Sequence, residues 1–203
     1  DKLQGKEFIC IPHQLAETGN GPVDWRYHDE HHQPLAEIFA ARGSFEYYGS
    51  PLQSKTSEKL KGHYLQDAWE LGIIIGVIAS PDHRGGRGKA AAWAEELTND
   101  ALFSAFHARH TYGTTGAKMG LFVNSGESLM GDKVLWSKPE PVSLHISAVA
   151  DRTIVRVEIL RNNKVVYEKT NNTDFLEFDW KDENTLKEKS TWNNKNLYVD
   201  GDG

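Results

Sequence analysis

Residues 71–88, LGIIIGVIASPDHRGGRG, decide how the rest of the chain is interpreted. The stretch contains a continuous apolar run, with aliphatic residues from Ile73 to Ile78 interrupted only by a glycine. An apolar run of this length between turn residues is typical of a strand that is buried on both faces. Ser80-Pro81 ends the run, and a glycine-rich loop then carries Asp82, His83, Arg84 and Arg87. Because ligands of parallel α/β folds bind at the carboxyl ends of strands, the stretch predicts a site at this point.

The composition is that of a globular protein with large loops. A chain of 203 residues suffices for one large domain or for one and a half smaller ones. The net charge of −6 argues against a general nucleic-acid binder. No apolar run approaches the length of a transmembrane helix, and a single cysteine excludes an internal disulfide framework. Nothing in the composition indicates a compartment.

The first half of the sequence has the pattern of an α/β protein. Apolar runs at 6–11 and 34–39 predict two strands before the one at 72–79, and residues 57–70 have apolar positions at helical spacing. This order fits βα units with parallel strands. A second helix is expected from Thr98, a good N-cap residue, to about residue 109.

From about residue 119 the pattern changes to short alternating strands. They are expected at 121–124, 133–136, 142–149, 153–160 and 163–168, with a last one near 197–199. Asn162-Asn163 is a candidate for a tight hairpin turn. We therefore divide the chain into an α/β part, 1–118, and a β-rich, sandwich-like part, 119–203.

Histidines and carboxylates follow the predicted strands of the first part. They are His13, Glu37 or Glu46, Asp82 and His83. If the strands are parallel neighbours, these side chains meet at one edge, and they are ordinary ligands of Zn, Mn or Fe. The alternative is equally well supported by spacing alone: His13 follows a strand and Asp82 caps the next turn. The arginines of the glycine-rich loop either bind an anion or are simply solvated.

Three more histidines, His28, His31 and His32, lie in the long polar loop at 14–33. They could cluster around a metal ion. Solvated side chains of a mobile or functional loop are the better-supported interpretation.

Several motifs in succession resemble those of one enzyme family. The motifs are IPHQ (11–14), LAEIFAARGSFEYY (35–48), GVIASPDHRGGRG (76–88) and LTNDALFSAFHARHTYGTTGA (97–117). Together they resemble the C-terminal half of metallohydrolases of the polymerase and histidinol phosphatase (PHP) superfamily. The carbaryl-hydrolase-like branch is the most similar, and the β-rich region resembles its C-terminal extension.

This resemblance implies the C-terminal part of a distorted, TIM-like (β/α)7 barrel that holds two or three divalent metal ions. His13, Asp82 and His83 would be metal ligands. Glu46 and Arg84 would be catalytic, and Glu37 and Arg87 would bind substrate. The remaining ligands of such a site would precede Asp1, so an upstream half of the same protein or a partner chain would complete the barrel. Adjacent strand residues point to opposite faces, so Asp82 and His83 can ligate together only if the backbone turns there.

The leading hypothesis is a metal-dependent hydrolase of this type, acting on a phosphoester, ester or related bond of a small molecule. The rival is a catalytically inactive subunit that serves as a scaffold or binding module in a larger assembly or oligomer. A third hypothesis is carbohydrate or surface binding through Trp136, Trp180 and Trp192 of the β-rich region.

Overall fold

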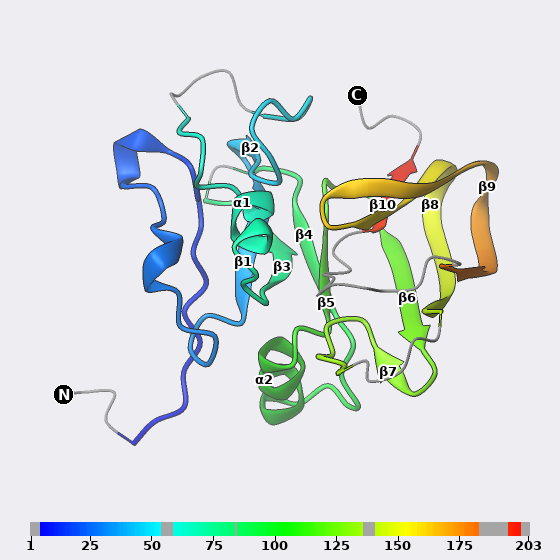
Figure 1. Cartoon of the computed structure of the whole chain (residues 1–203), viewed down its shortest axis with the longest axis horizontal. Helices are drawn as coiled ribbons and strands as arrows, with labels where there is room; N and C mark the ends of the chain where they lie inside the picture. Colours follow the sequence, from blue (N-terminus) through cyan, green and yellow to red (C-terminus); the bar gives the residue numbers. More distant parts are fainter. Residues whose placement is uncertain (1–4, 54–58, 84, 136–140, 183–194, 200–203) are drawn as a thin grey trace. The chain divides into compact units, whose positions relative to one another are not determined.

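The computed structural model describes residues 5–53, 59–83, 85–135, 141–182 and 195–199 (Figure 1). The chain divides into two compact units, Asp1–Thr115 and Gly116–Gly203. The boundary expected from the sequence lies three residues further on, at 118/119. Each unit is described by itself below. None of the helices in the described ranges is long and apolar enough to cross a membrane.

The first unit combines short strands with short helices. Its strands and helices are η1 (Thr18–Asn20), η2 (Trp25–Tyr27), β1 (Leu35–Ala40), β2 (Gly43–Ser44), α1 (Leu65–Glu70), β3 (Gly76–Ala79), β4 (Lys89–Ala92), α2 (Asn99–His107) and β5 (Thr111–Thr114). The strands form a three-stranded sheet in the order β2-β1-β3 and a separate β4-β5 pair. As expected for an N-cap, the Thr98 hydroxyl accepts a hydrogen bond from the Ala101 N–H at 3.3 Å.

The parallel pair of β1 and β3 is the part of this sheet that positions the site (Figure 1). In its register Ala36 lies opposite Val77 and Glu37 opposite Ile78. A side chain at Gly76 would not fit, because a Cβ there would lie 2.9 Å from Leu35 Cδ2. Glycine therefore lets β3 begin close against β1.

A compact apolar core supports this sheet. Leu15, Phe45, Tyr64 and Leu65 are fully buried in it, and Trp69 packs beside them. The indole N–H of Trp69 donates to the Ile75 carbonyl at 3.1 Å. This bond ties the chain that leads into β3 to helix α1.

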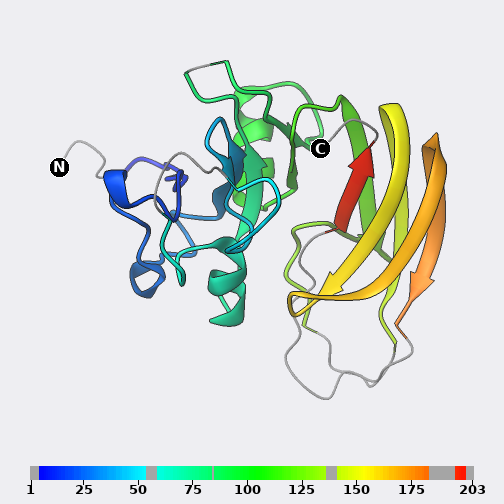
Figure 2. The same cartoon turned by 90° about the horizontal axis from the view of Figure 1, so that it is seen from above.

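The second unit is built on one long hairpin. Its strands are β6 (Met119–Ser125), β7 (Ser128–Leu129), β8 (Ser143–Arg161), β9 (Lys164–Lys181) and β10 (Lys195–Val199). β9 pairs with β8 along most of its length, β6 pairs with the first half of β8, and β10 pairs with the second half. Figure 2 shows β8 and β9 as a long twisted ribbon. The Asn162-Asn163 turn is confirmed, because both residues have positive φ angles, 49° and 62°.

The predicted (β/α)7 barrel is wrong. In the described ranges only β1 and β3 pair in parallel, all other strand pairs are antiparallel, and the α-helices number two. Helix α1 has six residues and lies in the connection between β1 and β3, and α2 lies between β4 and β5, which pair antiparallel. A TIM-like barrel is therefore excluded as a description of these residues.

Three predicted strands fail in whole or in part for a common reason, namely that apolar residues do not all enter a sheet. Residues 6–11 form no strand, and Cys10 within this segment is exposed. The run at 72–79 forms a strand only from Gly76, because Ile73 donates to the Ala68 carbonyl and so ends helix α1. Residues 133–135 are also not a strand, and residue 136 lies outside the described ranges.

Close packing of the glycine-rich loop on β3 yields a stability prediction. A Cβ at Gly88 would overlap the carbonyl group of Ser80, whereas Gly19 has open space around it. Gly88→Ala should therefore lower the free energy of unfolding by about 1–3 kcal/mol. The control Gly19→Ala should change it by less than about 0.5 kcal/mol. Urea denaturation measures both, and an unaffected Gly88→Ala variant would show that the loop does not pack as described.

Candidate functional site

Polar side chains gather at one edge of the sheet, near the carboxyl ends of β1 and β3. We use the name strand-end pocket for this group of residues: His13, Glu37, Ser80, Asp82 and His83. The parallel ladder extends past β3, because the Ser80 N–H donates to the Phe39 carbonyl at 3.0 Å. The backbone N–H of Glu37 donates to the Pro12 carbonyl, also at 3.0 Å, which places His13 beside β1. Three separate segments are thus joined at one edge of the sheet.

Glu37 is the most buried ionisable group of the pocket, with 4% of its surface exposed. Its Oε1 atom accepts a hydrogen bond from the Ser80 hydroxyl. Its Oε2 atom is buried 3.9 Å from His13 Nδ1 and makes no well-formed hydrogen bond with a described residue, although the backbone N–H of Gln14 also acts on this carboxylate. Buried carboxylate oxygens are normally satisfied, so this oxygen is an unfilled position.

Burial raises the pKa of the Glu37 carboxyl above its usual value of 4.5. The Ser80 hydroxyl and, to a smaller extent, the His13 imidazole act in the opposite direction. The Asp82 carboxylate adds a small repulsion that raises the pKa further. Glu37 is therefore a carboxyl group that gives up its proton less readily than one in water.

Asp82 and His83 form a closely paired dyad. The backbone turns at Asp82, which has a φ of 55°, and both the backbone N–H and the imidazole Nδ1 of His83 lie 2.6 Å from Asp82 Oδ1. The hydrogen bond from the His83 N–H, followed by the charges of His83, His13 and Arg42, lowers the pKa of Asp82. The Asp82 N–H donates in turn to the Ser80 hydroxyl at 3.3 Å. Ser80 therefore links the dyad to Glu37.

Two non-glycine residues beside the pocket adopt left-handed backbone conformations. They are Asp82 and Gln14, whose φ is 53°. Such conformations are uncommon for residues with a side chain, and they persist where the surrounding structure holds them. Both residues occur where the chain leaves the edge of the sheet. Strained backbone conformations of this kind cluster at functional sites.

The other predicted site residues differ in their positions. Glu46 lies before helix α1, where its backbone N–H bonds the Ser44 hydroxyl and its carbonyl accepts from the Gln66 N–H. Arg87 is exposed on the glycine-rich loop. Arg84 lies outside the described residues. The structure thus joins His13, Glu37, Asp82 and His83, whereas these bonds tie Glu46 to the beginning of α1.

Two residues of this edge were not predicted. Ser80 was assigned only to the turn after the strand, although a hydroxyl at a strand end can bond a neighbouring carboxylate. Arg42 lies in the turn between β1 and β2, and its Nη1 is 3.7 Å from Glu17 Oε2. A lone arginine in a turn carries no recognisable sequence pattern.

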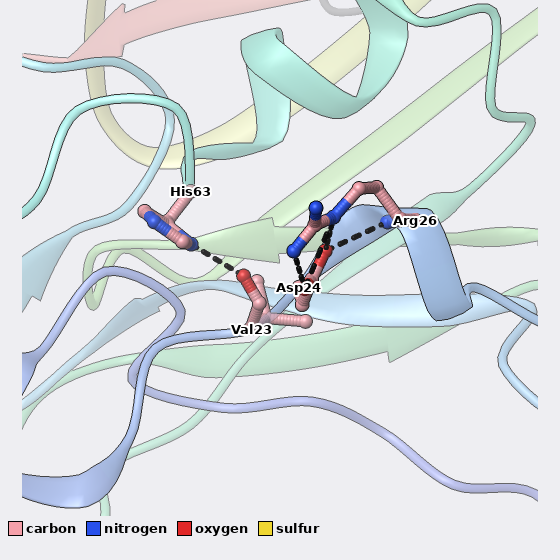
Figure 3. A network of polar contacts seen from close by, with 4 residues as sticks. All are labelled: Val23, Asp24, Arg26 and His63. Atoms are coloured by element: carbon pink, nitrogen blue, oxygen red, sulfur yellow. Dashed lines mark hydrogen bonds and ion pairs between the residues drawn. The ribbon is translucent and has the colours of Figure 1, made fainter.

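The long polar loop is anchored by contacts of its own (Figure 3). His63 Nδ1 donates to the Val23 carbonyl at 2.5 Å. Asp24 accepts hydrogen bonds from the backbone and the guanidinium group of Arg26, which lower the pKa of its carboxyl to about 2. His28 is partly buried with its ring edge-on to Trp25, and burial lowers its pKa. It is therefore not a fully solvated histidine.

No three His, Cys, Asp or Glu side chains among the described residues stand ready as a metal site. The expected description of the protein as a metal-binding, phosphoesterase-like hydrolase on a TIM-like barrel is therefore not supported by the fold. The reason is that the two strands bring together paired groups, His13 with Glu37 and Asp82 with His83, rather than one shared cage.

Comparisons with known proteins indicate no enzyme family. Residues 46–146 match a family model described as a protein of unknown function (DUF3604). An uncharacterized protein of Chlamydia pneumoniae is 28% identical over 198 residues, covering 87% of this chain. The chain spans about a third of the length of that relative, 32%. No solved structure matches.

The resemblance to the polymerase and histidinol phosphatase superfamily is not supported by these comparisons. The matching model and the relative carry no assigned function, and neither indicates that superfamily. Short motifs such as IPHQ and SPDH fit many strand ends, so their succession gave a misleading similarity. The same comparisons give no support for the carbaryl-hydrolase-like branch.

The raised pKa of Glu37 predicts how stability depends on pH. The folded state holds this proton more tightly than the unfolded state, so Glu37 should destabilise the protein as pH rises from about 4.5 through its folded-state pKa. Glu37→Gln cannot ionise, so with EDTA present its stability relative to wild type should increase over that range. Urea denaturation at a series of pH values measures the difference. A difference that is constant with pH would contradict the burial of an ionisable Glu37.

Proposed function

We propose that the strand-end pocket is a metal-dependent hydrolytic site that acts on a phosphoester, ester or related bond. One observation carries the proposal, namely the buried Oε2 atom of Glu37, which makes no well-formed hydrogen bond with a described residue and faces His13. Leaving such an oxygen unsatisfied costs free energy. A cation bound there would remove this cost.

The donor atoms of the pocket fit a divalent cation. Carboxylate oxygen and imidazole nitrogen are the ligands that Zn, Mn and Fe take in catalytic sites. Glu37 and His13, whose Oε2 and Nδ1 atoms lie 3.9 Å apart, are the residues that would hold the ion. Water, substrate or residues beyond the described part of the chain would supply the other ligands, as in catalytic sites that keep open positions.

A divalent metal held at this point would lower the pKa of a bound water toward about 7 and would polarise a substrate oxygen. The protein's own contribution is proton transfer by His83. Asp82 Oδ1 accepts the Nδ1–H of His83, which leaves Nε2 of the imidazole to take a proton from water and return it to a leaving group. Because the His83 side chain is 77% exposed, its Nε2 is accessible to substrate.

The rival proposal is a binding subunit that catalyses no reaction. It is favoured by the separate pairing of the four metal-competent groups, none of which form a set of three in the described part of the chain. In that case His13–Glu37 and Asp82–His83 only stabilise the turns that end β1 and β3. Metal affinity distinguishes the two proposals.

Equilibrium dialysis against Mn²⁺ or Zn²⁺, followed by elemental analysis, tests the proposal. We expect close to one metal ion per chain, with affinity reduced at least about tenfold in His13→Ala and in Glu37→Gln. The matched control is His145→Ala, because His145 is a strand histidine of the second unit that also lies beside carboxylates, Glu177 and Asp179. It should bind metal like the wild type.

Two outcomes would contradict the proposal. One is a correctly folded wild-type chain, judged by circular dichroism, that binds no divalent metal. The other is metal binding that His13→Ala and Glu37→Gln leave unchanged. The first outcome supports the binding subunit instead.

A further inference from the structure

The long polar loop at 14–33 contains a histidine, His28, that the proposed chemistry does not use. It follows η2, whose Trp25 belongs to the apolar core and is 5% exposed. The His28 ring stands edge-on to the Trp25 ring, with the ring centroids 6.4 Å apart. The backbone N–H of His28 donates to the Trp25 carbonyl at 3.3 Å. Both the backbone and the ring of His28 are therefore held against Trp25.

The two ring nitrogens of His28 are buried in this position. Neither Nδ1 nor Nε2 makes a well-formed hydrogen bond with a described residue, although the Gln33 side chain also acts on the ring. Burying a charged group without hydrogen-bond partners costs far more free energy than burying a neutral one. The contact between His28 and Trp25 therefore suits the neutral imidazole and not the imidazolium.

The charges around His28 do not offset this cost. Among the described residues, the carboxylates of Asp29 and Glu30 act on the ring, and both favour its protonated form. Asp29 is already engaged, because its Oδ2 atom lies 2.7 Å from Nδ1 of His32. Burial is the larger effect, and it lowers the pKa of His28 below the ordinary value of 6.5. A protonated His28 is thus better accommodated in water than against Trp25.

The segment that follows His28 supports the strand-end pocket. Residues 28–33 lead directly to β1, and the Gln33 N–H closes a turn on the Asp29 carbonyl at 2.7 Å. The His32 carbonyl accepts the Cys10 N–H at 2.7 Å, which ties this turn to the segment that leads to His13. The position of His13 therefore depends in part on the order of residues 28–33.

We propose that His28 is a pH-operated latch, whose neutral ring on Trp25 fixes residues 28–33 and whose protonation releases them. The released segment binds a proton more readily than the fixed one, so release becomes more favourable as the pH falls below about 6.5. At higher pH the latch is closed, and His13 is supported beside Glu37. This consequence for the site rests on the proposed function, whereas the latch itself does not.

Hydrogen exchange of the backbone amides, measured by mass spectrometry with EDTA present, tests the latch. The protection of residues 28–33, corrected for intrinsic chemical exchange, should fall about threefold from pH 7.5 to pH 5.5. His28→Phe keeps a ring against Trp25 but cannot take up a proton, so its protection should stay constant over this range. The matched control is His31→Gln, which removes a histidine of the same loop that is 58% exposed. It should respond to pH like the wild type.

Two results of this experiment would overturn the proposal. One is wild-type protection that is equal at the two pH values, and the other is a loss at low pH that persists in His28→Phe. An NMR titration of the His28 ring in the wild-type chain covers the case in which His28→Phe does not fold. A midpoint below that of histidine in a short peptide supports the latch, and a midpoint at or above it overturns the latch.

Failure of the latch is distinguishable from failure of the proposed function. Protection of residues 28–33 that depends on pH, found together with absent metal binding, would overturn the hydrolytic function and leave the latch standing. Metal binding with protection that is independent of pH would do the reverse.

Discussion

The hydrogen bond between the Ser80 hydroxyl and the Glu37 carboxylate is the interaction on which the strand-end pocket depends. It joins the ends of two strands that are far apart in sequence. It also offsets part of the free-energy cost of burying the Glu37 carboxyl group. Because Ser80 also accepts the Asp82 N–H, the same hydroxyl fixes where the Asp82–His83 dyad begins. Parallel pairing of β1 with β3 brings these groups within reach, and the glycine-rich loop packs around them.

Opposite shifts in pKa distinguish the two carboxyl groups of the pocket. Burial raises the pKa of Glu37, whereas hydrogen bonding from His83 and nearby positive charge lower that of Asp82. Environments that separate the pKa values of neighbouring acids are characteristic of sites with divided roles. Here Asp82 accepts hydrogen bonds from His83, and in the proposed function the Glu37 carboxylate would offer an oxygen to a cation.

Sequence patterns predicted the two strands that form the strand-end pocket better than they predicted the elements around those strands. The apolar runs at 34–39 and 72–79 indicated two strands with parallel pairing, and the strands form at 35–40 and, over a shorter range, at 76–79. The same rule failed at residues 6–11, because an apolar run alone does not say whether a neighbouring strand is available to pair with. The barrel failed for a larger reason: β1 and β3 are the one parallel pair among the described strands, and the other strand pairs are antiparallel. Ser80 and Arg42 could not be predicted, since their roles arise from contacts with Glu37 and Glu17, 43 and 25 positions away.

The central claim is that Glu37 keeps a buried oxygen available to a cation at the joined ends of β1 and β3. An anomalous difference map from a crystal of this chain soaked in Mn²⁺ tests it most directly. The account predicts a peak within coordination distance of Glu37 Oε2, beside His13 and Asp82. A map in which Glu37 Oε2 is bonded to another protein group, with no manganese at the strand ends, would contradict it.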